Sequence, residues 1–151
     1  MSHDARLSAL NITLPDAPAP AANYVPYVRS GNLLYVSGQI SAGPDGPIKG
    51  RLGDDLDVAA GAAAARNCGL ALLAQARAAL GSLDQVVRVV KLGAFVCSSN
   101  DFTDQPEVVN GCSDLMVEVF GEAGRHARAA VSVNALPRGV AVEIEAIFEV
   151  A

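Results

Sequence analysis

The sequence predicts an α+β fold, in which a mixed β-sheet carries two helices on one face. Two observations lead to this prediction. Segments typical of strands and helices follow one another in the order strand, helix, strand, helix, strand, strand. The chain has 151 residues, of which 51% are hydrophobic and only 18% charged, so it can fill one core and still expose apolar surface. A single domain of ordinary size is therefore expected.

The first 22 residues are interpreted as an N-terminal leader, and residues 23–151 as the domain. The leader is polar and rich in Pro and Ala, and its Asp-Ala-Pro-Ala-Pro stretch at 16–20 should be extended or loosely packed. It lacks a basic start followed by an apolar run, so it is not a signal peptide. No membrane span is predicted either, and the expected location is the cytoplasm.

The first half of the domain predicts one strand and one long helix. Residues 33–40 combine β-branched and aromatic side chains, and the Gly- and Pro-rich turn at 43–47 follows them. The Ala-rich segment 57–80 is expected to be a helix, because Asp57 can cap its first turn and Gly81 can end it.

The second half predicts an interior strand, an amphipathic helix and a hairpin. Residues 86–97 are mostly apolar on both faces, which is typical of an interior strand. Asp104 can cap the next helix, which has one continuous apolar stripe. Residues 128–135 and 140–150 then alternate between apolar and polar around a turn, which predicts an antiparallel hairpin. The apolar stripe of the helix that Asp104 can cap comprises residues 108, 109, 112, 115, 116, 119 and 120.

A four-residue turn in this hairpin would bring several polar side chains to one face. Ser132 would then lie opposite Glu143, and both would share a face with Arg128 and Asn134. Two helices can cover only the other face, so we expect association of subunits to cover this one.

Two residues on this face are candidates for chemistry. Arg128 lies near a strand end beside small alanines, where its planar guanidinium can hold a carboxylate; a surface arginine paired with a glutamate is the alternative. Glu143 lies mid-strand among apolar residues, where desolvation at a subunit interface would raise its pKa and suit it to orient water. A solvated or interface charge is the alternative.

Three further positions are unusual for their elements. Tyr27 follows Pro26 directly before the first strand. The Ser37-Gly38 pair interrupts that strand, which indicates either a bulge or close approach of a ligand. Asn110 precedes a glycine inside the second helix, an unusual place for two poor helix formers, and helix packing would explain that glycine about as well as function does.

Charge and composition exclude several classes of protein. The net charge of −5 argues against a general nucleic-acid binder, which should be basic. Cys68, Cys97 and Cys112 are far apart in sequence and have no histidine at a ligand spacing, so neither a metal site nor a thiol nucleophile is expected.

Several segments resemble signatures of the Rid/YjgF family. Residues 128–147 combine an arginine, alternating valines, Leu-Pro and Val-Glu-Ile-Glu, as the C-terminal signature of that family does. Residues 32–39 resemble its N-terminal signature, and Asn100-Asp-Phe102 and Asn110 fall where the family has an Asn-Asp-Phe turn and a helix asparagine. The order and spacing agree from about residue 27 to residue 150.

The resemblance implies a chorismate-mutase-like homotrimer with its sheets inside, its helices outside and its sites in clefts between subunits. It also implies hydrolytic deamination of small enamine and imine acids such as 2-aminoacrylate, to keto acids and ammonia, without a metal or an organic cofactor. Arg128 would pair with the substrate carboxylate and Glu143 would position the attacking water. The residues that would line the pocket are Tyr27, Ser37, Gly38 and Asn110.

The sequence also departs from the family pattern. Ala129 and Ala130 stand where the deaminases usually have Ser or Thr and then Cys or a similar residue. These differences indicate a divergent branch and leave two alternatives open. One is a non-catalytic trimer that binds small carboxylates or acts through protein contacts. The other is an endoribonuclease or translation inhibitor, which the acidic charge disfavours.

Overall fold

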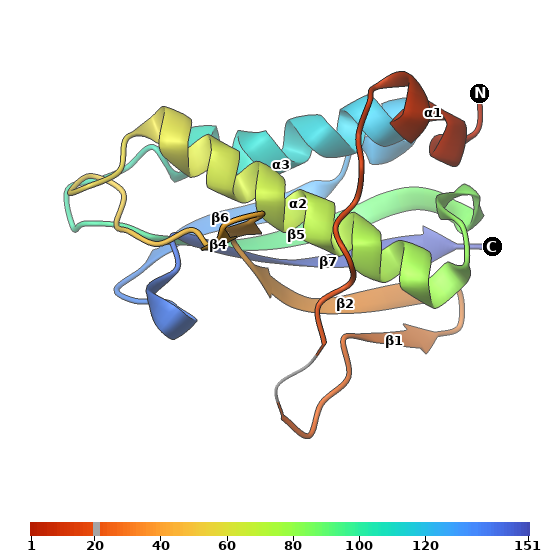
Figure 1. Cartoon of the computed structure of the whole chain (residues 1–151), viewed down its shortest axis with the longest axis horizontal. Coiled ribbons are helices and arrows are strands. Elements are labelled where there is room, and N and C mark those ends of the chain that lie inside the picture. Colours follow the sequence, from red (N-terminus) through yellow and green to blue (C-terminus); the bar gives the residue numbers. More distant parts are fainter. Residues whose placement is uncertain (20–21) are drawn as a thin grey trace.

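The computed structural model describes residues 1–19 and 22–151 (Figure 1). The main strands are β1 (Tyr27–Ser30), β2 (Leu33–Ile40), β5 (Val86–Cys97), β6 (Ala127–Val133) and β7 (Val142–Val150), and the long helices are α2 (Val58–Leu80) and α3 (Gln105–Phe120). The five strands form one sheet in the order β1-β2-β7-β5-β6, in which only β5 and β6 run parallel. Both helices lie on one face of this sheet (Figure 1). The predicted α+β fold is confirmed.

Local sequence signals set the ends of the two long helices. The side chain of Asp57 accepts a hydrogen bond from the backbone N–H of Ala60, which caps the start of α2. Gly81 ends this helix with φ of 83°, a left-handed conformation that favours glycine. Asp104 precedes α3, as predicted, although its side chain makes no capping hydrogen bond.

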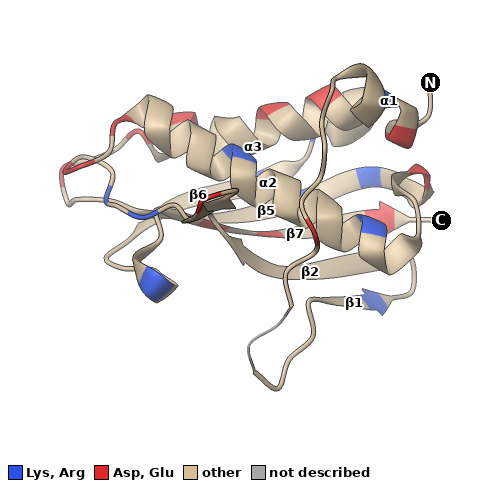
Figure 2. Cartoon of the chain, in the orientation of Figure 1, with Lys and Arg blue, Asp and Glu red and all other residues tan. Residues whose placement is uncertain are grey.

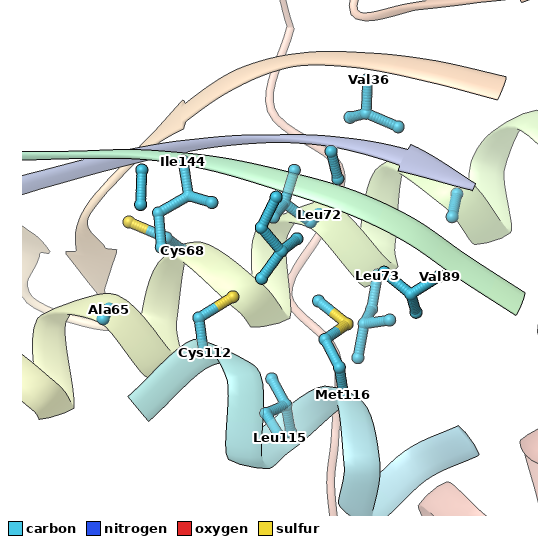
Figure 3. Close-up of a cluster of buried hydrophobic side chains, with 14 of the residues drawn as sticks. Val36, Ala65, Cys68, Leu72, Leu73, Val89, Cys112, Leu115, Met116 and Ile144 are labelled. Carbon is cyan, nitrogen blue, oxygen red and sulfur yellow. The ribbon is translucent and has the colours of Figure 1, made fainter. Parts of the chain in front are cut away.

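The core lies between the sheet and the two helices. Every position of the apolar stripe predicted for α3 is buried, and Figure 3 shows Cys112, Leu115 and Met116 of this stripe among side chains of α2 and the sheet. The helices also touch through their backbones, because a Cβ on Gly111 would collide with the carbonyl of Ala62. Packing therefore accounts for the glycine that follows Asn110.

The predicted hairpin of 128–135 with 140–150 is wrong. Among the strands that the structure describes, β6 pairs with β5 alone, in parallel, and β7 lies between β2 and β5. The reason is topological: α3 carries the chain from the end of β5 back to its beginning, so β6 starts at the same end and runs parallel.

This pairing separates side chains that were expected on one face. Arg128 pairs with Leu92, which is buried beneath the helices, so the arginine points to the helix side. Glu143 pairs with Phe95, on the face away from the helices. Ser132 pairs with Val96 and is likewise on the helix side, not opposite Glu143.

The N-terminal segment, of which only residues 16–20 were expected to be extended or loosely packed, packs on the domain. A helix that the sequence analysis missed, α1 (His3–Ala9), contacts α3, and the chain then crosses over α2 (Figure 1). Leu7 and Leu14 are buried, because these apolar residues cover the helices. Residues 16–19 of the Pro-rich stretch form no helix or strand, and residue 20 lies outside the described residues.

The sheet face away from the helices exposes large apolar side chains. Val28, Tyr35 and Val131 are 52%, 43% and 46% exposed, and each pairs across strands with another residue of this open face. Such a face is typical of a surface that another protein covers, so cover by a second subunit stays a prediction. No described helix has the length and apolar character needed to cross a membrane.

Candidate functional site

The guanidinium of Arg128 is fixed against α3. Its Nη1 donates to Oδ1 of Asn110 at 2.9 Å and to Oγ of Ser113 at 3.1 Å, and its Nη2 donates to the carbonyl of Pro106 at 3.3 Å. A guanidinium has five N–H donors, so Nε and one hydrogen of Nη2 have no acceptor among the described residues. These two N–H groups can each donate a hydrogen bond to one oxygen of a carboxylate.

No described carboxylate forms an ion pair with Arg128. The ion pairs among the described residues join Arg51 to Asp54, Arg66 to Glu118 and Arg125 to Glu122. The described residues therefore do not show the alternative interpretation, in which Arg128 pairs with a surface glutamate. Arg128 is half-buried and has donors to spare.

Sequence reasoning missed two residues beside this arginine. Ser113 accepts from Arg128 and lies three residues after Asn110, so the two share one face of α3. His126 contacts Ser113, with Nε2 2.9 Å from the hydroxyl oxygen. The i, i+3 spacing on a predicted helix was the signal that could have identified Ser113. No comparable signal marked His126.

Glu143 lies beside the interruption of β2. The register of β2 against β7 shifts between Val36 and Gln39, so Ser37 and Gly38 form a bulge. A Cβ on Gly38 would lie only 2.5 Å from Oε2 of Glu143. The glycine therefore makes room for this carboxylate, whose pKa is raised by burial and by the nearby Glu145.

The bulge also binds the segment that precedes β1 through hydrogen bonds. Ser37 donates its side-chain O–H to the carbonyl of Val25 at 2.8 Å and its N–H to the carbonyl of Pro26 at 2.9 Å. Tyr27 follows, and it pairs with Val36 and packs partly against the core. Four of the six candidate residues thus gather around β1, β2 and the start of β7.

One chain does not bring all six candidates together. Arg128 and Asn110 lie at the β6 edge of the sheet, whereas Tyr27, Ser37, Gly38 and Glu143 lie toward the opposite edge. β6 and β7 are separated by β5, which puts these strands about 10 Å apart. Arg128 and Glu143 also point to opposite faces of the sheet. The candidates therefore form two separate groups in one chain, which we call half-sites: Arg128 with Asn110, and Glu143 with Tyr27, Ser37 and Gly38.

Two hollows of the surface differ in what lines them. A hollow of about 360 Å³ opens on the sheet face away from the helices and is lined by Tyr35, Ser37 and Glu145, among others. A wider one, of about 650 Å³, lies at the start of α2 beside Asp54 and Asp55 and contains none of the candidates. Only the first hollow touches a half-site.

The cysteines are buried thiols. Cys68, Cys97 and Cys112 are all buried and unpaired, and burial raises the pKa of Cys112 to about 12. Within residues 1–19 and 22–151, no three His, Cys, Asp or Glu side chains converge to hold a metal ion. Figure 2 shows that Lys and Arg residues are scattered over the elements rather than gathered in one patch.

Comparisons with known proteins identify relatives along nearly the whole chain. A family model described as Endoribonuclease L-PSP matches residues 14–150. Protein TCP17 of Trypanosoma cruzi is 55% identical over 147 residues, which cover 96% of this chain and 92% of that protein. The 2-iminobutanoate/2-iminopropanoate deaminase of Mus musculus is 32% identical over 144 residues, which cover 90% and 87% of the two chains.

A solved structure agrees with these relatives. The crystal structure of Atu1372 from Agrobacterium tumefaciens, a protein of unknown function, superposes with a TM-score of 0.91 at 48% identity and covers 99% of this chain and 92% of its own. The match extends through the sheet and both helices to the N-terminal segment. The chain belongs to the Rid/YjgF family, whose family model carries the description Endoribonuclease L-PSP.

Proposed function

We propose that this protein hydrolyses small imine and enamine acids of the 2-aminoacrylate type to keto acids and ammonia, in the cytoplasm and without a metal or organic cofactor. One observation carries the proposal. Arg128 is held by three hydrogen bonds to α3 and keeps two donors for a carboxylate. The deaminase activity named for the mouse relative supports the reaction class.

The active site is proposed to form between subunits of a homotrimer. One subunit supplies Arg128 and Asn110, and its neighbour supplies Glu143 with the residues around it. The two half-sites of the single chain support this arrangement, because neither can act alone. The exposed apolar face, with Val28, Tyr35 and Val131, supports association as well.

The reaction requires positioning more than activation. 2-Aminoacrylate tautomerises to 2-iminopropanoate, whose C=N carbon is already electrophilic. Water adds to that carbon, the C–N bond of the resulting carbinolamine breaks, and pyruvate and ammonia leave. Glu143, with its raised pKa, accepts a proton from the attacking water and passes it to the nitrogen, which leaves as ammonia. Arg128 holds the carboxylate so that the carbon faces this water.

The roles of the remaining candidates follow from their positions. Asn110 holds Nη1 of Arg128 and so keeps the guanidinium turned toward the cleft. Gly38 leaves room beside Glu143 for a substrate and a water molecule. Ser37 and Tyr27 fix the segment that borders this space.

Turnover of 2-aminoacrylate tests the proposal directly. A dehydratase generates the enamine in place, and its loss and the release of ammonia are followed with and without this protein. Wild type should accelerate ammonia release, and Arg128→Ala should reduce kcat/KM by about a hundredfold, because a carboxylate loses a bidentate charged partner. Arg128→Lys should recover only part of this loss, since an ammonium cannot offer two parallel donors.

Two results would contradict the proposal. A wild-type protein without effect on 2-aminoacrylate that still binds pyruvate would indicate a carboxylate-binding protein. RNA cleavage that survives purification and disappears in Arg128→Ala would indicate a nuclease. The net charge of −5 and the scattered basic residues argue against the nuclease (Figure 2).

A further inference from the structure

A directed chain of hydrogen bonds ends on the proposed carboxylate-binding arginine. Nδ1 of His126 lies 2.6 Å from the carbonyl of Gly124. A carbonyl oxygen only accepts, so Nδ1 carries the proton of this ring. Burial lowers the pKa of His126 and outweighs the hydrogen bond to Gly124, which raises it, and the nearby Arg128 lowers it further. Since Nδ1 donates to Gly124 and Nε2 faces a hydroxyl that accepts from Arg128, the contacts fit a neutral ring with Nε2 as the acceptor.

The neutral ring sets the direction of the next hydrogen bond. Nε2 of His126 lies 2.9 Å from Oγ of Ser113, so the hydroxyl donates to the ring. Its oxygen lone pairs are then free to accept from Nη1 of Arg128 at 3.1 Å. Without this acceptor, the hydroxyl hydrogen could turn toward the guanidinium, where two donors would face each other.

We propose that His126 is a positioning residue, which acts through Ser113 to fix the edge of the Arg128 guanidinium that meets the substrate carboxylate. With Ser113 and Asn110 both accepting from Nη1, that nitrogen is saturated. The carboxylate therefore meets the edge formed by Nε and Nη2. The inference rests on the proposed function of Arg128.

The far end of the chain of hydrogen bonds is rigid. The 3-10 turn at Gly121–Gly124 follows α3 directly, and a Cβ on Gly124 would collide with the carbonyl of Met116. The carbonyl that accepts from His126 is thus held against the helix that also carries Ser113. Arg125, the charged neighbour in sequence, is occupied in an exposed ion pair with Glu122.

Four variants separate this role from a structural one. His126→Ala and Ser113→Ala should each raise KM for the imine and the Kd for pyruvate by about tenfold, the effect of one hydrogen bond to a charged group. kcat should stay nearly unchanged, because Arg128 holds the carboxylate equally in the ground and transition states. His126→Gln should recover most of the affinity, since its amide oxygen can accept in place of Nε2. The double variant of His126→Ala with Ser113→Ala should be no worse than Ser113→Ala alone.

The chain offers a matched control in its other histidine. Nε2 of His3 lies 3.1 Å from the carbonyl of Val86, and the ring packs edge-on against Phe120, away from Arg128. His3→Ala also removes a half-buried imidazole with a backbone partner. It should leave KM and the Kd for pyruvate at their wild-type values.

A measurement without substrate keeps the inference independent of turnover. The Nε–H resonance of Arg128, assigned by its loss in Arg128→Ala, should move and exchange faster with solvent in His126→Ala and Ser113→Ala, but not in His3→Ala. If Arg128→Ala abolishes binding while the His126 variants match wild type in both measurements, the inference fails and the proposed function stands. Additive effects of His126→Ala and Ser113→Ala would also overturn it. If Arg128→Ala binds and turns over like wild type, the proposed function itself fails.

Discussion

At the scale of single residues, Glu143 combines poor solvation with a position in the proposed active site. Its carboxylate is half-buried, its pKa is raised by burial and by Glu145, and no described residue donates a hydrogen bond to it. A native carboxyl with a raised pKa favours the unfolded chain at any pH where the group is ionised. The residue thus lowers stability at neutral pH, as functional residues often do.

Replacing this carboxylate should stabilise the protein in a pH-dependent way. Glu143→Gln is expected to raise Tm above neutral pH, where the wild-type group is ionised in both states. The gain should fade as pH falls through the raised native pKa, and it should be absent below the usual pKa of glutamate, where the wild-type group is protonated in both states. Thermal melts of both proteins from pH 4 to pH 8 measure this difference. An equal gain in Tm at pH 4 and at pH 8 would show that the charge of Glu143 is not the cause of the stabilisation.

At the scale of elements, the bulge in β2 couples strand geometry to the half-site. The register shift between Val36 and Gln39 brings Gly38 so close to the Glu143 side chain that a Cβ at this position would force the carboxylate to move. Most strand glycines weaken a sheet. Gly38 leaves room for the side chain of Glu143 on β7. The sheet stability that this glycine costs is therefore linked to the proposed active site.

A methyl group at this bulge should therefore be costly. Gly38→Ala is expected to reduce kcat/KM strongly, because the Glu143 carboxylate has to leave its position, and to lower stability only slightly, because that carboxylate ends a flexible, half-buried side chain. Gly43→Ala is the matched control: there a Cβ would meet only the Ile48 and Asn67 side chains at 3.9 and 4.0 Å. Steady-state kinetics and urea unfolding of both variants test the difference, and equal effects would show that Gly38 has no special role.

At the scale of the whole molecule, the proposed function makes activity depend on the assembly of subunits. Arg128 and Glu143 face opposite sides of the sheet, on strands separated by β5. Contact between them through one substrate requires a second copy of the chain. The exposed apolar face gives such a copy a surface to bury.

Subunit mixing tests this arrangement. The mass in solution should be three times 15.5 kDa. Arg128→Ala and Glu143→Ala should each be inactive alone. Unfolded together and refolded as mixed trimers, they should regain part of the wild-type rate, because some clefts then combine an intact Arg128 with an intact Glu143. No recovery in trimers shown to be mixed would place both residues in one subunit's site.

The sequence predicted the elements well because their signals are local. Asp57 and Gly81 mark the ends of α2, and the apolar stripe marks α3. The neighbour of β6 was predicted wrongly, because apolar alternation determines which face of a strand is buried but not which strand lies beside it. Ser113 and His126 were missed for a similar reason, since their contact joins a helix to a loop through side chains alone.

The N-terminal segment limits how far the chain can be shortened. Leu7 and Leu14 are buried on the helices, and the side chain of Gln75, inside α2, donates to the carbonyl of Pro18 at 2.7 Å. A truncation that begins at residue 23 would uncover apolar surface on two helices and leave a buried amide without its main acceptor. Any minimal version of this enzyme candidate has to keep the N-terminal segment, even though that segment carries none of the proposed reacting groups.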